Sequence, residues 1–170
     1  SKTDKLVKGT IHLVASIALT DKGPDYAVGA FEAVQPGLFA QIAAGVVAPE
    51  LANVAERQKR VVAVGFGLLL CRSASMRHQP NAGVLPALLS AQLKLLLTPS
   101  SATATQDEDL LYADEDNTAA VQYQSNFSKL AASETAKSDP TRAVLQGKEL
   151  TSWFSGVLQQ WSAELGEQTW

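Results

Sequence analysis

The chain is poor in cysteine, histidine and aromatic residues, and these shortages exclude several kinds of site. Of its 170 residues one is cysteine and two are histidine, and aromatic side chains make up 6%. The lone thiol, Cys71, excludes a disulfide framework and a cysteine-based zinc site. His12 and His78 have no second ligand at metal-binding spacing, so we expect no metal site, no cofactor and no catalytic residue.

Positive charge is also scarce. The net charge of −3 argues against nucleic acid as the main partner, because binding phosphates requires a basic surface. Residues 1–98 carry ten Lys and Arg and six Asp and Glu, whereas residues 99–170 carry four and eleven. Six of those eleven acids lie between Asp107 and Asp116, so a single segment makes the second half acidic.

No stretch is long and apolar enough to predict a membrane span. The best candidates are residues 33–49, which contain glutamine and proline, and residues 61–71, which are too short. A membrane helix needs about 20 apolar residues. The polar, basic N-terminus shows no secretory signal, and the missing initiator Met favours a piece of a longer chain. We therefore expect a soluble protein without membrane insertion.

Most of the sequence shows the hydrophobic periodicity of α-helices. Hydrophobic residues make up 46% of the chain, and they recur at intervals of three and four residues. This spacing predicts helices at 2–20, 24–34, 37–53, 55–72, 84–97, 117–137 and from Leu150 to Leu165. In the first of them Leu6, Leu13 and Ile17 widen the expected buried face. Pro49 should kink the third helix, and Asp139 and Pro140 resemble a cap and the first residue of a further helix.

The helix at 55–72 is the most informative, because its body at 61–71 is apolar on every side. Such a helix must be covered over most of its circumference. With short turns and no strand required, the chain is predicted to be all-α, with antiparallel helix pairs stacked as HEAT repeats in an α-solenoid fragment. We expect about two helix pairs in 1–97, an acidic low-complexity loop at 98–116 and the terminal helices of the array at 117–170.

The acidic loop is the best candidate for a functional element, since no catalytic constellation indicates an enzyme. It could steer a basic partner electrostatically, or it could be a solvated loop. The candidate protein-binding residues are Asp107, Glu108, Asp109, Asp114, Glu115 and Asp116.

Two further motifs have a structural interpretation and a functional one. Gly65-Phe66-Gly67 begins like a dinucleotide fingerprint, but it lacks the third glycine, and close helix packing explains it more simply. Trp153, Phe154 and Trp161 share one helix face, where core packing is favoured over a partner-binding stripe.

Several segments occur in an order that resembles a known family. They are SKTDKLVKGTIHLVAS, FEAVQPGLFAQIAAGVVAPELANV with its Pro49-Glu50 pair, ERQKRVVAVGFGLLLC, LPALLSAQLKLL, and the acidic DEDLLYADED followed by YQSNFSKLAASETAKSDP. Over residues 1–140 their order and spacing resemble the C-terminal end of the importin-α re-exporter family. These proteins, also called exportin-2 or cellular apoptosis susceptibility proteins, form part of the karyopherin-β superfamily.

The resemblance implies a nuclear export receptor that carries importin-α back to the cytoplasm in complex with Ran-GTP. It also implies shuttling between nucleus and cytoplasm through the pore, with nucleoporins as further partners. The family chiefly grips Ran through N-terminal repeats that this chain lacks, so we expect the chain alone not to form the export complex. The alternative is an unrelated α-solenoid scaffold or a helical adaptor for protein–protein interaction.

Overall fold

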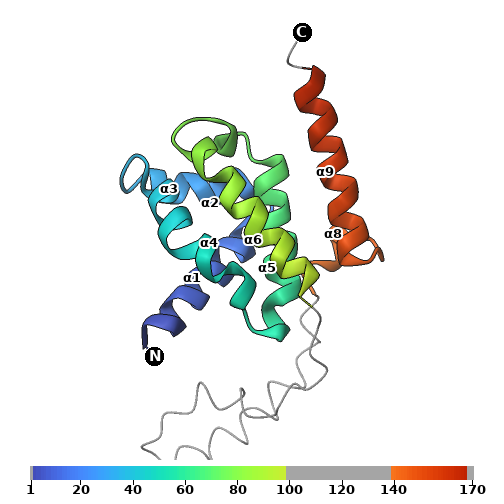
Figure 1. Cartoon of the computed structure of the whole chain (residues 1–170), viewed down its shortest axis with the longest axis horizontal. Coiled ribbons are helices and arrows are strands. Elements are labelled where there is room, and N and C mark those ends of the chain that lie inside the picture. Colours follow the sequence, from blue (N-terminus) through green and yellow to red (C-terminus); the bar gives the residue numbers. More distant parts are fainter. Residues whose placement is uncertain (1, 99–138, 168–170) are drawn as a thin grey trace, which may run out of the picture. The chain divides into compact units, whose positions relative to one another are not determined.

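A computed structural model describes residues 2–98 and 139–167, and the structural statements below concern these residues (Figure 1). Every regular element within them is helical, which confirms the predicted all-α class, and the helices pack against one another as in a HEAT-like fragment. The predicted helix at 117–137 lies outside the described residues, as does the acidic loop except for its first residue, Thr98.

The helices follow the predicted order, with bounds within a few residues of those expected. The longer ones are α1 (Lys2–Ala18), α2 (Gly23–Glu32), α5 (Glu56–Arg72), α6 (Leu85–Leu97) and α9 (Leu150–Glu167). The shorter ones are α3 (Leu38–Ile42), η1 (Ala43–Val47), α4 (Ala48–Glu50), η2 (Leu51–Asn53), η3 (Ser75–Arg77), η4 (Asn81–Val84) and α8 (Arg142–Leu145).

The turn between α2 and α3 is built by one carboxylate and one glycine. Gly37 adopts φ +79°, a left-handed conformation that costs glycine little. The Glu32 side chain accepts hydrogen bonds from the backbone N–H groups of Gly37 (2.7 Å) and Phe39 (3.3 Å). These two donors at the start of α3 have no partner inside the helix, so the carboxylate acts as their cap.

The helical run from α3 to η2 accommodates Pro49 by widening the turn before it. The segment η1 is a π-helix, and the Ala48 N–H donates to the Ala43 carbonyl five residues back. A proline ring collides with the carbonyl four residues back and supplies no N–H of its own. The predicted kink at Pro49 stays a prediction, and the structure shows a π-helical turn at Ala43–Val47 that ends two residues before the proline.

The helix α5 lies at the centre of the fold, in contact with α1, α2, α6 and α9 (Figure 1). All ten residues from Val62 to Cys71 are buried, which confirms that this helix is enclosed. Gly65 and Gly67 explain how its neighbours come so close. A Cβ atom at Gly65 would lie 2.4 Å from the Ala15 carbonyl oxygen in α1, and one at Gly67 would lie 2.8 Å from the Trp153 ring in α9. The prediction that these glycines permit close helix packing is confirmed.

The aromatic face of α9 belongs to the core. Trp153 and Phe154 are 6% and 3% exposed, and their packing against α5 favours the core-packing interpretation of this face.

The start of α8, the helix before α9, was predicted two residues too early. Thr141 is the N-cap of α8, so Pro140 lies in the turn before the helix and is not its first residue.

A buried hydroxyl joins the start of α2 to the end of α5. Ser73 Oγ donates to Asp25 Oδ1 (2.6 Å) and accepts from the Met76 N–H (3.3 Å), while the Ser75 N–H also donates to Asp25 Oδ1 (2.9 Å). Partial burial raises the pKa of Asp25, but the hydrogen bonds from Ser73 and Ser75 outweigh it and hold the pKa below the ordinary value of 3.8.

We predict that Gly65→Ala destabilises the fold by about 1–3 kcal/mol, because the new methyl group must push the α1 backbone away. The control is Gly156→Ala in α9, where a Cβ atom would meet nothing within 4 Å. That change should stabilise the helix by about 0.5–1 kcal/mol. Urea unfolding measures both, and equal effects of the two substitutions would contradict the close approach of α1 and α5.

We predict that Asp25→Asn lowers stability at pH 7 by about 1 kcal/mol or less, since the carboxylate is largely exposed. A depressed pKa contributes stability above pH 3.8, and this contribution is lost as the pH falls through the lowered value. The difference between the variant and the parent chain should therefore shrink as the pH falls below 3.8 and through the lowered pKa of Asp25. Thermal melts across pH measure it, with Asp21→Asn as the exposed control, and a difference independent of pH would contradict the assignment.

Candidate functional site

The six acidic residues predicted to contact a partner lie within 99–138, outside the described part of the chain. Their role stays a prediction. Thr98 is the last described residue before this segment, and Asp139 is the first described residue after it. The residues around Thr98 form the candidate site.

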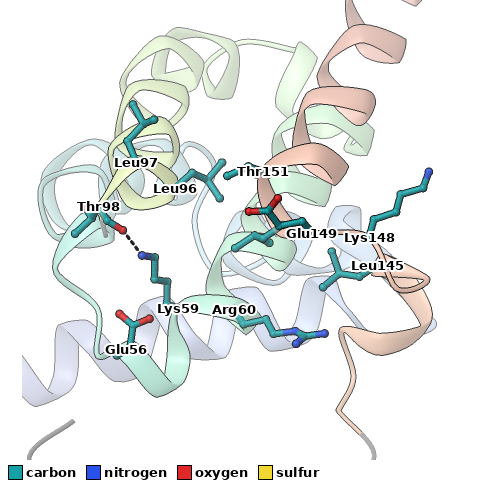
Figure 2. Close-up of a pocket in the computed structure, with 11 residues that line it drawn as sticks. Glu56, Lys59, Arg60, Leu96, Leu97, Thr98, Leu145, Lys148, Glu149 and Thr151 are labelled. Carbon is teal, nitrogen blue, oxygen red and sulfur yellow. Dashed lines mark hydrogen bonds between the residues drawn. The ribbon is translucent and has the colours of Figure 1, made fainter. Parts of the chain in front are cut away.

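A cavity of about 440 Å³ lies beside Thr98, between the start of α5, the end of α6 and the start of α9 (Figure 2). Charged and apolar side chains share its walls. They are Glu56, Lys59, Arg60, Leu96, Leu97, Thr98, Leu145, Lys148, Glu149, Leu150 and Thr151.

Two consecutive basic residues of α5, Lys59 and Arg60, line this cavity and bond to residues of other segments. Lys59 is only 9% exposed, and its ammonium group donates a hydrogen bond to the backbone carbonyl of Thr98 (Figure 2). The carbonyl end of a helix carries partial negative charge, so the cation also stabilises the end of α6. Arg60 Nε donates to Thr141 Oγ1 at 2.9 Å. The first turns of α5 thus anchor the chain on both sides of the segment 99–138.

These anchors could not be identified from the sequence. The partner of Lys59 lies 39 residues away and that of Arg60 lies 81 residues away. The available signal in the sequence was that Lys59 and Arg60 directly precede the apolar body of α5. Basic side chains at such a position can bond to the ends of neighbouring helices.

Cys71 and His12, two residue types often used in catalysis, lie in structural surroundings in the described part of the chain. Burial raises the pKa of the Cys71 thiol to about 11, although Arg72 and Arg77 oppose the shift, so the thiol is protonated at neutral pH and is a poor nucleophile. The His12 ring bonds locally to Ser16 Oγ at 3.0 Å within α1. Among the described residues, no group of three His, Cys, Asp or Glu is arranged to hold a metal ion. No helix in those residues has the length and apolarity needed to cross a membrane.

Large apolar side chains are exposed on α1, α2 and α6, and the two on α1 correct the sequence analysis. Leu6 and Leu13 of α1 are 71% and 57% exposed, although they were expected to widen its buried face. The buried face of α1 consists of Ile11, Val14, Ala15 and Ala18. On α6, Leu97 is exposed as well.

Comparisons with known proteins agree with this architecture. The family model described as "CAS/CSE protein, C-terminus" matches residues 1–169. The importin-alpha re-exporter of Schizosaccharomyces pombe is 29% identical over 155 residues, which cover 88% of this chain and 16% of that protein. The chain therefore spans about one sixth of the length of this relative. No solved structure matches. With its helical fold and a match along nearly its whole length, the chain belongs to the CAS/CSE family and corresponds to the C-terminal part of its members.

Proposed function

We propose that this chain is the C-terminal HEAT-repeat part of a nuclear export receptor that carries importin-α back to the cytoplasm in complex with Ran-GTP. The observation that carries the proposal is the match of the C-terminal family model to residues 1–169. The name of the S. pombe relative supports importin-α as the cargo. The receptor would shuttle between nucleus and cytoplasm and contact nucleoporins on the way.

A stack of helices suits this role because transport needs binding and release but no bond chemistry. Solenoids present extended surfaces and change curvature at little cost. When two partners bind one flexible array, each alters the affinity for the other by the same factor. Ran-GTP and importin-α would be coupled in this way through the complete receptor, with the present chain contributing its last helices.

The exposed leucines indicate how the chain joins the rest of such a receptor. Leu6 and Leu13 are seven residues apart on one side of α1, opposite the face that packs on α5. In the proposed array they pack against another helix pair, as adjacent repeats do in solenoids.

The test is a chimera in which this chain replaces the aligned region of the S. pombe importin-alpha re-exporter. We predict that the chimera binds importin-α in the presence of Ran-GTP with an affinity within about tenfold of the parent receptor. The isolated 170-residue chain should form no stable ternary complex in light scattering after size exclusion. A folded chimera that binds neither partner would favour the alternative, an unrelated scaffold or helical adaptor.

The same chimera tests the acidic loop. We propose that Asp107, Glu108, Asp109, Asp114, Glu115 and Asp116 steer a basic surface of the partner. Replacing all six with the corresponding amides should weaken assembly by about 1–2 kcal/mol at low salt, because exposed ion pairs contribute a few tenths of a kcal/mol each. It should also flatten the salt dependence, since fewer charges are left to be screened.

Titration calorimetry at several salt concentrations measures both effects. The control is the exposed acid Asp21 in the turn before α2, where Asp21→Asn should change neither quantity. An unchanged affinity and salt slope in the sixfold variant would show that the loop only keeps the protein solvated.

A further inference from the structure

Lys59 is a buried lysine that bonds to an uncharged acceptor. Its side chain is 9% exposed, and its ammonium group donates a hydrogen bond to the backbone carbonyl of Thr98 (Figure 2). Taking an ammonium group out of water is costly, and lysine is rarely buried to this extent unless it is paired. An apolar side chain at this position would avoid that cost. What the lysine adds is a fixed position for the last residue of the chain before the segment 99–138.

Thr141 is held in a similar way on the other side of this segment. It is fully buried, and its hydroxyl oxygen accepts a hydrogen bond from Arg60 Nε at 2.9 Å. A threonine at an N-cap usually bonds to its own helix, but Thr141, the N-cap of α8, makes no side-chain capping bond. Its hydroxyl joins α8 to α5 instead. Two adjacent residues of α5 therefore hold the chain just before the segment and just after it.

The candidate acidic residues begin close to the first of these anchors. Asp107 is nine residues after Thr98, and nine residues of fully extended chain span at most about 30 Å. At physiological salt the attraction between exposed charges decays over about 8 Å. Fraying of the last turn of α6 would move Thr98 by about 5 Å, the pitch of one helical turn. A displacement of this size is enough to change how many acids come within range of a partner's charges.

We propose that Lys59 is a positioning residue for partner binding. By holding the end of α6 it sets where the six acidic residues meet the partner, and Arg60 supports it from the other side through Thr141. The inference rests on the steering role proposed above for these acids. Asp116 is 25 residues before Thr141, so the anchor at Thr98, which is nearer to the acids, has the larger effect.

The sign of the charge separates positioning from simple attraction. Lys59 and Arg60 are cations, and the partner surface proposed for the acidic residues is basic, so the two side chains repel that surface. If only their charge mattered, removing Lys59 would strengthen binding. If the position of the acids matters, the same change weakens binding.

The first test measures the anchor in the 170-residue chain. Lys59→Met keeps a long, flexible side chain and removes the donor. We expect amide hydrogen exchange at the end of α6, where the Thr98 N–H donates to the Lys94 carbonyl (2.9 Å), to accelerate at least about fivefold. Exchange in the body of α5 should not accelerate. Unchanged exchange at Thr98, or uniform acceleration along the chain, would overturn the inference, because Lys59 would then not hold the end of α6 in particular.

The second test is a double-mutant cycle in the chimera, with the affinity for importin-α measured in the presence of Ran-GTP at low salt. We expect Lys59→Met to weaken binding about threefold. Thr141→Val removes the hydroxyl without a change of charge, and it should weaken binding about twofold or less. In the sixfold variant, whose acids are replaced by amides, neither substitution should have a further effect, because the charges that the anchors position are absent.

Each other outcome of the cycle contradicts a different statement. Equal weakening by Lys59→Met in both backgrounds would show a merely structural role and overturn the inference. Stronger or unchanged binding of Lys59→Met, while the sixfold variant binds more weakly, would overturn the inference and leave the steering proposal in place. Unchanged affinity of the sixfold variant would remove the steering proposal, and the inference with it.

The matched control lies at the other end of α5. A second cavity there, of about 210 Å³, has Arg77 and Trp161 among its lining residues. Arg77 Nη2 donates to the Cys71 carbonyl (3.4 Å) and to Glu164 Oε2 (3.3 Å), so this cation also joins distant parts of the chain but holds neither Thr98 nor Thr141.

Arg77→Met removes one positive charge, as Lys59→Met does, and it should not weaken binding of the chimera to importin-α. Thermal melts verify that each variant is folded. If Arg77→Met weakened binding as much as Lys59→Met, the loss of any partly buried cation would explain both results, and the positioning role of Lys59 would be wrong.

Discussion

The close packing of α5 against its neighbours is the constraint on which the rest of the structure depends. Gly65 lets the α1 backbone approach, and Gly67 lets the Trp153 ring of α9 approach. A side chain at either position would separate the helices and remove many small dispersion contacts at once. The body of α5 is enclosed, and both cavities lie at its two ends.

The two ends of α5 carry the polar contacts that join distant parts of the chain. At its start, Lys59 and Arg60 bond to Thr98 and Thr141, which stand before and after the acidic segment. After its end, Ser73 bonds to Asp25 of α2. One helix thus combines an apolar body that stabilises the fold with polar ends that place the connections and candidate binding sites.

Much of the fold could be predicted from the sequence, because helical periodicity and helix-breaking residues are local signals. The enclosed body at 61–71 and the role of Gly65 and Gly67 followed from residues close together in the chain. The exposure of Leu6 and Leu13 could not be predicted in this way. A wide apolar stripe on a helix does not indicate which of its edges a neighbouring helix covers. The π-helical turn before Pro49 was not predicted either, since the sequence indicated only a kink at the proline.

The candidate site was less predictable than the fold. The six acidic residues between Asp107 and Asp116 were noticed because they are concentrated in one segment, and their role is still a prediction. Arg77 showed no signal in the sequence, and Trp161 was noted only as part of an aromatic face for which core packing is favoured. Their common cavity exists only because η3 and α9 converge there.

The sequence by itself determined the all-α class, the order of the helices and the family, since these depend on periodicity and on residues that keep their order and spacing. Only the tertiary structure decided which polar groups meet. The bonds of Lys59, Arg60 and Arg77 span 39, 81 and 87 residues of chain, respectively. Each buried donor has to find an acceptor somewhere in the fold, and local pattern does not specify which distant acceptor packing brings within reach.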